Sequence, residues 1–150
     1  MSSESDARSG CYALAIKYLA AREHSRAELT RKLGAKGYLR DLIEQVLDEL
    51  GGQNLQSDTR YCQAVISSRK RKGYGPVYIR YYLKQKGVSS DLVDSVLDFN
   101  DPAWQKALSD AANKKFGADQ PEDFSQKAKQ MNFLKRRGFT PDQIRRYYGG

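Results

Sequence analysis

The sequence predicts an all-α protein made of three tandem three-helix (helix-turn-helix-like) repeats that form an elongated, curved array. Apolar residues recur at the three- and four-residue spacing of amphipathic helices, and no segment of useful length alternates as a strand does. A sequence pattern of about fifty residues is also repeated three times, with helix-start and helix-stop signals at matching positions. Because the units of such an array contact mainly their neighbours, we expect an extended molecule.

The first unit is expected over residues 11–55, after a Ser-rich tail at residues 1–10 that we expect to be disordered. Its first helix should run over residues 11–22. One face of that helix carries the apolar set Tyr12, Ala15, Ile16 and Leu19. These residues predict an amphipathic helix that packs on one side.

The second helix of this unit has clear start and stop signals. Ser25 and Glu28 form a capping box, in which each side chain accepts a hydrogen bond from the other residue's backbone amide. Gly37 can adopt the left-handed conformation that ends a helix. A third helix is predicted over residues 40–50, before Gly51 and Gly52.

The second and third units are expected over residues 56–100 and 101–150. Their first helices share an aromatic-x-x-Ala-aliphatic pattern with the first unit: Tyr12, Ala15, Ile16; Tyr61, Ala64, Val65; and Trp104, Ala107, Leu108. Their second helices end alike, at Leu33 to Gly37, Leu83 to Gly87, and Leu134 to Gly138. Because the glycines match as well as the apolar period, we interpret the units as true repeats.

The prolines and further caps support these boundaries. A proline is tolerated at the first position of a helix, where its missing N–H costs nothing. We therefore expect helices to start at the four prolines, Pro76, Pro102, Pro121 and Pro141. Thr140 and Gln143 form a second capping box, and Ser89 occupies the matching cap position one unit earlier.

Composition favours an anionic partner and gives little support to catalysis. The formal net charge is +8, and the basic excess lies in residues 57–150. Cys11 and Cys62 are too few for a disulfide framework, and no apolar run is long enough for a membrane span, so we expect a soluble, cytoplasmic protein. The only histidine, His24, is interpreted as a capping or surface group. We expect no enzymatic activity, no cofactor and no metal site.

The strongest functional signal lies between Asp58 and Asp91, a stretch without a single acidic residue. It holds a cluster of four consecutive cations, and then tyrosines and further cations on the next helix. The candidate contact residues here are Arg69, Lys70, Arg71, Lys72, Tyr74, Tyr78, Arg80, Tyr81 and Lys84. The helix dipole explains one or two of the four clustered charges, so we expect the others to meet an anionic face. The tyrosines could pack between units or stack on bases or a partner protein.

A second concentration of positive charge occupies the corresponding helices of the third unit. Its candidate contact residues are Lys127, Lys135, Arg136, Arg137 and Arg145. If both basic faces turn the same way, the array has one extended positive side. Such a side would bind polyanions with high salt sensitivity and without reading sequence.

Two segments resemble the RecX family, the bacterial regulators of the RecA recombinase. They are residues 22–33, Arg-Glu-His-Ser-Arg-Ala-Glu-Leu-Thr-Arg-Lys-Leu, and residues 68–76, Ser-Arg-Lys-Arg-Lys-Gly-Tyr-Gly-Pro. The resemblance continues to Gly87 and covers nearly the whole chain from Cys11 onward. It implies three tandem three-helix repeats and a non-enzymatic protein that lies in the groove of the RecA–DNA filament. It also implies reduced RecA ATPase, strand-exchange and coprotease activity.

We accordingly expect the partners to be the RecA filament and single- or double-stranded DNA bound without sequence preference. We expect a monomer and no membrane association. One alternative is a stand-alone DNA-binding protein that uses its basic helical face. Another is a scaffold whose target is unrelated to DNA.

Overall fold

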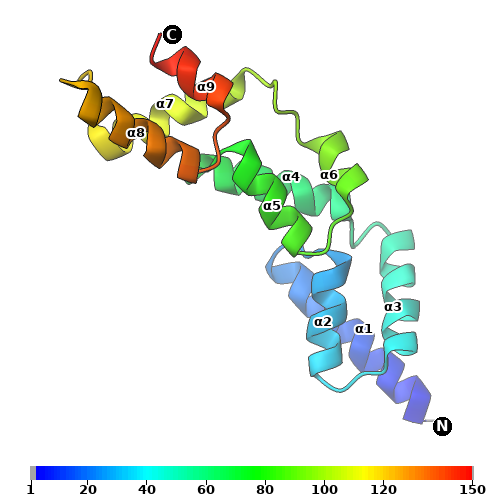
Figure 1. Ribbon diagram of the computed structural model, residues 1–150. Coiled ribbons are helices and arrows are strands. Elements are labelled where there is room, and N and C mark those ends of the chain that lie inside the picture. Colours follow the sequence, from blue (N-terminus) through cyan, green and yellow to red (C-terminus); the bar gives the residue numbers. More distant parts are fainter. Residues whose placement is uncertain (1–2, 150) are drawn as a thin grey trace.

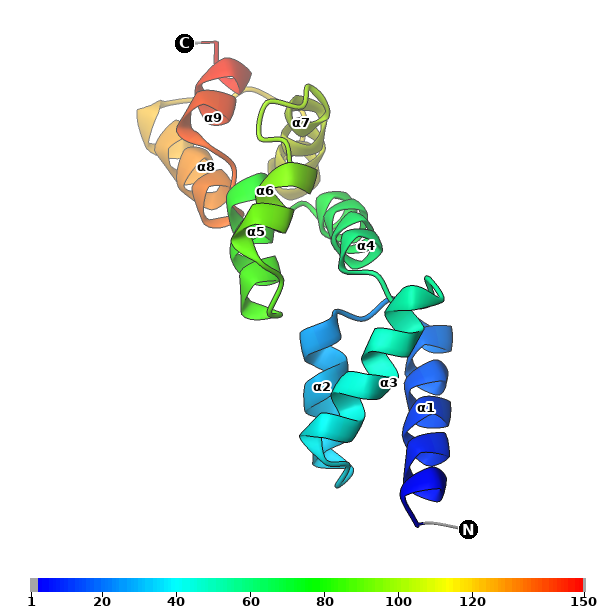
Figure 2. The same cartoon turned by 90° about the vertical axis from the view of Figure 1, so that its right-hand side faces the viewer.

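The computed structural model describes residues 3–149 and consists, over that range, of helices and loops without strands. The first unit contains α1 (Ser3–Ala21), α2 (Arg26–Ala35) and α3 (Arg40–Gly52). The second contains α4 (Asp58–Arg71), α5 (Pro76–Gln85) and α6 (Ser90–Val96). The third contains α7 (Ala103–Phe116), α8 (Phe124–Arg136) and α9 (Pro141–Tyr147). The units follow one another along an elongated molecule (Figures 1 and 2), which confirms the predicted fold class.

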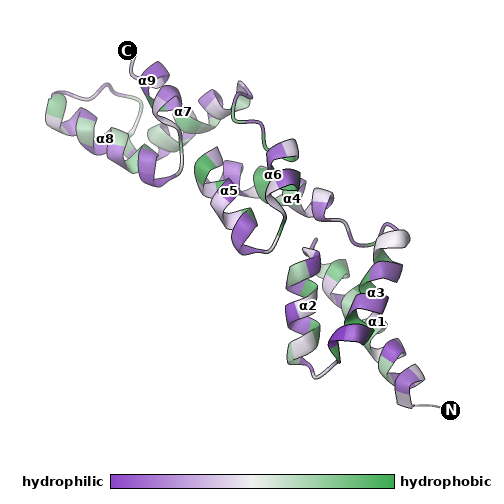
Figure 3. Ribbon diagram, turned by 45° about the vertical axis from the view of Figure 1, so that its right-hand side comes forward, coloured by the Kyte–Doolittle hydropathy of each residue, from purple (hydrophilic) through white to green (hydrophobic). Residues whose placement is uncertain are grey.

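Hydrophilic and hydrophobic residues are interspersed along the helices (Figure 3), and the hydrophobic ones supply the cores. The first unit has a core of its own, formed by Cys11, Ala15, Leu29, Leu33, Ile43, Val46, Leu47 and Leu50. The second and third units share one continuous core that includes Tyr61, Ile79, Leu83, Trp104, Leu108, Leu134 and Phe139. Within residues 3–149, no helix is long and apolar enough to cross a membrane.

Most of the predicted helix starts are confirmed. Capping boxes stand at Ser25 and Thr140, and the Ser89 side chain accepts a hydrogen bond from the backbone amide of Leu92. Pro76 and Pro141 are the first residues of α5 and α9, and Pro102 immediately precedes α7.

The prediction for Pro121 is wrong, because α8 begins three residues later. Asp123 is its N-cap, and the carboxylate accepts a hydrogen bond from the backbone amide of Gln126 at 2.8 Å. A carboxylate satisfies a free helix-terminal N–H, which a proline ring cannot do.

The prediction of a disordered tail is also wrong for residues 3–10, which form the first turns of α1. Arg8 anchors this segment to α3, because its guanidinium donates to the side chains of Gln45 and Glu49, each at 2.9 Å. Gly10 leaves room for the Tyr38 hydroxyl, which would lie 2.8 Å from an added Cβ. Residues 1 and 2 lie outside the described range.

The second helices of the three units, α2, α5 and α8, follow one another end to end along the molecule (Figure 1). At the junction of α8 and α5, the amides of Gly75 and Val77 donate to the carbonyl oxygens of Arg137 and Gly138, at 2.8 and 2.9 Å. The carbonyls just after the end of α8 thus satisfy amides at the start of α5 that have no partner within their own helix.

The junction of α5 and α2 also joins the end of one helix to the start of the next, but through a side chain. The Ser25 hydroxyl, at the start of α2, donates to the carbonyl oxygen of Lys86, at the end of α5, at 2.9 Å. The amide of Arg26 donates to the carboxylate of Asp58, the first residue of α4, at 2.8 Å. We call this series of end-to-end helices the spine.

The glycines that end the spine helices differ in what surrounds them. Gly37, Gly87 and Gly138 all have positive φ, at 95°, 82° and 96°. A Cβ on Gly87 would lie 2.4 Å from the Ala27 Cβ, and one on Gly138 would lie 2.4 Å from Tyr78. A Cβ on Gly37 would meet nothing within 4 Å. Two of the three repeated glycines therefore serve a close contact between units as well as a turn.

Candidate anion-binding groove

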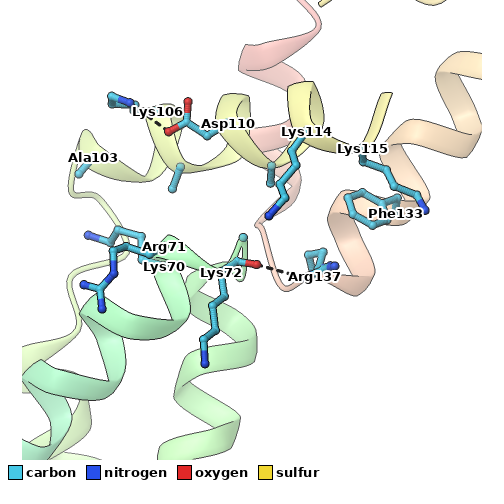
Figure 4. A pocket seen from close by; sticks show the side chains of 13 residues that line it. Lys70, Arg71, Lys72, Ala103, Lys106, Asp110, Lys114, Lys115, Phe133 and Arg137 are labelled. Carbon is cyan, nitrogen blue, oxygen red and sulfur yellow. Dashed lines mark hydrogen bonds and ion pairs between the residues drawn. The ribbon is translucent and has the colours of Figure 1, made fainter. Parts of the chain in front are cut away.

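A groove of about 470 Å³ lies where the second and third units meet. Its walls are the end of α4, the length of α7, and the last turns of α8 (Figure 4). Small residues form its base, including Gly73 and Ala111, whose Cβ lies 3.4 Å from the position of a Cβ added at Gly73. These small residues leave space between α4 and α7.

The groove is strongly positive. Seven basic residues line it: Lys70, Arg71, Lys72, Lys106, Lys114, Lys115 and Arg137. Asp110 is the one acidic lining residue, and it pairs with Lys106 at 3.0 Å. Lys114 extends from α7 into the opening, toward the end of α4 (Figure 4). Charges of one sign in a concave site reinforce one another and attract anions.

Arg137 fixes one wall of the groove. Its guanidinium donates to the carbonyl oxygen of Lys72 at 3.3 Å and so joins α8 to the end of α4. It also lies over the rings of Tyr74 and Phe133, at 4.7 and 5.1 Å from their centroids. Hydrogen bond and cation–π contacts together hold this charge at the junction.

Two cations of the α4 cluster are also positioned by neighbours. The Lys70 ammonium lies 4.4 Å from the centroid of the Trp104 ring, and Arg71 donates to the Ser67 hydroxyl at 2.7 Å. Arg71 and Lys72 remain exposed. The cluster thus has a partly structural role, and the charges of its exposed members remain available to bind an anion.

The tyrosines of the predicted site mostly pack within the protein. Tyr74 stacks on Tyr78 with centroids 4.2 Å apart, and Tyr78 lies 6.3 Å from Tyr82. Arg69 covers the ring of Tyr82 at 4.5 Å. Tyr81 differs, because its side chain is 64% exposed.

Other predicted contact residues lie outside the groove. Arg80 pairs with Asp94 of α6 at 2.8 Å, which offsets much of its charge, and Lys84 is half-buried on α5. Lys127 lies 6.0 Å from the centroid of the Tyr148 ring. Arg145 is paired with its neighbour Asp142, and Lys135 is exposed near the end of α8.

A second hollow extends the positive surface along α8. Lys129 and Arg136 line it, together with Lys115, Phe133 and Arg137, which it shares with the groove. The structure therefore brings together most of the α4 cluster, Arg136 and Arg137. It leaves Arg80, Tyr81, Lys84, Lys127 and Arg145 apart from them.

Sequence reasoning missed Lys106, Lys114 and Lys115 of α7. A signal for two of them was present, because aligning Trp104 on Tyr61 places Lys114 and Lys115 at the positions of Arg71 and Lys72. The basic helix end thus occurs in both units, and the two ends face each other across the groove.

The described residues contain no cluster of His, Cys, Asp or Glu that could hold a metal ion. His24 is buried, so its interpretation as a surface group is wrong. Its ring contacts the carbonyl oxygen of Arg22 and the ammonium of Lys32, at 3.1 and 2.9 Å, in the first unit.

The groove between the second and third units presents fixed positive charge beside aromatic rings. Such a site suits the binding of phosphate groups.

Comparison with known proteins identifies the family of this chain. Residues 11–50, 57–97 and 104–148 match the first, second and third three-helix domains of RecX. The chain belongs to the RecX family. The matched stretches each fall within one predicted unit.

Curated RecX relatives are similar over most of their length. The chain is 42% identical to the regulatory protein RecX of Pseudomonas tolaasii over 136 residues, which cover 91% of this chain and 88% of the relative. It is 40% identical to that of Pseudomonas syringae pv. tomato with the same coverage. The crystal structure of RecX from Lactobacillus salivarius has the same fold, with a TM-score of 0.79 at 20% identity over 97% of this chain and 96% of that chain.

Proposed function

We propose that this RecX family member binds along the filament that the RecA recombinase forms on DNA. It regulates RecA, mainly by lowering the ATPase, strand-exchange and coprotease activities of the recombinase. The protein acts by occupying the filament, without chemistry of its own. Its basic groove lies against DNA phosphates, and the rest of the array contacts recombinase subunits.

The observation that carries this proposal is the groove between the second and third units. Seven cations and a single acid surround a space of about 470 Å³, and the positive surface continues along α8. Phosphate contacts of this kind are strong at low salt and blind to sequence. Such a surface suits a polyanion that is already part of an assembly, where the other contacts supply the specificity.

The shape of the molecule supports a filament as the target. Three units joined through the spine present a long surface. An elongated ligand can contact several subunits along the helical groove of a filament at once, and these linked contacts strengthen binding. The curated relatives are named regulatory proteins, which agrees with control of another protein's activity.

The test is ATP hydrolysis by the cognate RecA on single-stranded DNA as this protein is added. We expect the rate to fall as the protein rises through the micromolar range, with the DNA kept saturated by recombinase. An unchanged rate over that range would contradict the proposal.

A stand-alone DNA-binding function is the second candidate, because the groove alone could hold a nucleic acid backbone. Binding to bare single-stranded DNA and to preformed filaments, measured at the same salt concentration, separates the two. The main proposal predicts tighter binding to filaments. Equal binding to bare DNA, or selective binding to one duplex that persists at high salt, would favour the second candidate.

A further inference from the structure

The spine has two unpartnered ends, and they lie at opposite ends of the molecule (Figure 1). One is the C-terminal end of α2, where a Cβ added at Gly37 would meet no atom within 4 Å. The other is the start of α8, whose first residue, Phe124, is exposed. Within the chain, the equivalent surfaces contact each other twice, at the α5–α2 and α8–α5 junctions.

Each free end carries a large apolar side chain that is exposed to solvent. Leu39 is 77% exposed and follows the Gly37 turn, and Phe124 is 83% exposed at the first position of α8. At the positions equivalent to Leu39, the other units have Ser89 and Thr140, whose side chains cap the next helix. Leu39 makes no such hydrogen bond, and most of its surface is exposed to solvent.

The two ends also carry opposite charges. Exposed Arg31 and Lys36 lie at the α2 end. Exposed Asp119, Glu122 and Asp123 lie just before Phe124 at the α8 end. Bringing the ends together would place cations of one copy near carboxylates of another, beside two apolar side chains that lose contact with water.

We propose that the α2 end of one copy docks on the α8 end of a second copy, so that the spine continues from chain to chain. The occupant of each end is therefore another molecule of this protein. Because the contact is head-to-tail, it generates an open chain or a ring rather than a two-fold dimer. The internal junctions advance along the molecule, which favours an open chain.

The proposal is independent of the recombinase and of DNA, and it is tested with this protein alone. Sedimentation velocity over a range of concentrations should show a weight-average mass that rises above the 17.0 kDa of one chain. Added salt should reduce this rise, because opposite charges contribute to the contact.

Two variants provide a specific test. Leu39→Ser supplies the cap residue found in the other units, and Phe124→Ser changes a side chain that is outside the core, so both should retain the helical content of the parent protein. Every copy of either variant lacks one half of the contact, so each alone should remain at the mass of one chain. An equimolar mixture should form a dimer and nothing longer, because only one productive pair of ends remains.

Three results would overturn the proposal. The parent protein could stay at the mass of one chain up to its solubility limit. A single variant could associate as the parent does, which would indicate another surface. The mixture could fail to associate although both variants are folded.

Discussion

The seven cations of the groove differ in how much freedom the fold leaves them. Lys70 and Arg137 lie over aromatic rings, and Lys106 pairs with Asp110, so each already has a structural partner. Lys114 is exposed and extends into the opening. Replacing Arg137 would disturb the junction of α4 and α8, whereas replacing Lys114 tests charge with little effect on packing.

His24 shows how a buried group depends on its neighbours. Lys32 Nζ lies 2.9 Å from Nε2, and the Arg22 carbonyl oxygen lies 3.1 Å from Nδ1. An ammonium can only donate, so Nε2 accepts and Nδ1 carries the proton of a neutral ring. Burial lowers the pKa of His24, and the charges of Arg22 and Lys32 lower it further, against the opposing effects of the Arg22 carbonyl and Glu28.

This geometry predicts that acid weakens the first unit. Because the pKa of His24 is lower when folded than its ordinary 6.5, the unfolded chain binds more protons just below pH 6.5. The free energy of unfolding should therefore be fully maintained above pH 6.5 and fall as the pH drops below it. Urea unfolding on both sides of this pH measures the change, and His24→Gln should flatten it. An equal slope in the variant would assign the effect to other groups.

At the level of elements, the ends of helices were the most predictable features. Ser25, Ser89 and Thr140 were identified because capping depends on a few adjacent residues. The start of α8 was misplaced because both Pro121 and Asp123 are good start signals, and local sequence does not decide between them. The helical residues 3–10 could not be foreseen, since Arg8 reaches partners on α3 that are far away in sequence.

The repeated glycines give a test of the spine. Gly37→Ala should cost only the strain of a positive φ, on the order of 1–2 kcal/mol. Gly87→Ala adds the same strain and also places a Cβ 2.4 Å from that of Ala27, which should cost about 1–3 kcal/mol more.

Urea unfolding of the two variants measures this difference, with Gly37→Ala as the matched control. Adding Ala27→Gly to Gly87→Ala should recover part of the loss, because it removes the atom that clashes. Equal losses for Gly37→Ala and Gly87→Ala would show that the end-to-end contact does not constrain this turn.

At the scale of the whole molecule, the sequence predicted which units are basic but not where their charges meet. The excess in residues 57–150 and the Arg69 to Lys72 cluster were visible from composition. The groove depends on how α7 lies against α4, and that angle follows from packing of the core shared by two units. The repeat alignment could point to Lys114 as a basic residue at a helix end, but only the packing of α7 against α4 shows that it lines the groove.

Binding to a RecA filament assembled on single-stranded DNA tests the central claim most directly. Lys114→Glu reverses a charge in the groove, and Lys17→Glu makes the same change at an exposed site on α1, the corresponding first helix of another unit. We expect Lys114→Glu to weaken binding by about 10- to 150-fold, since a charge-assisted contact contributes about 1.5–3 kcal/mol, and Lys17→Glu to leave binding nearly unchanged. Equal weakening by both variants would show that binding depends on the net charge of the protein and not on the groove. No weakening by Lys114→Glu would contradict a role of Lys114 in the complex.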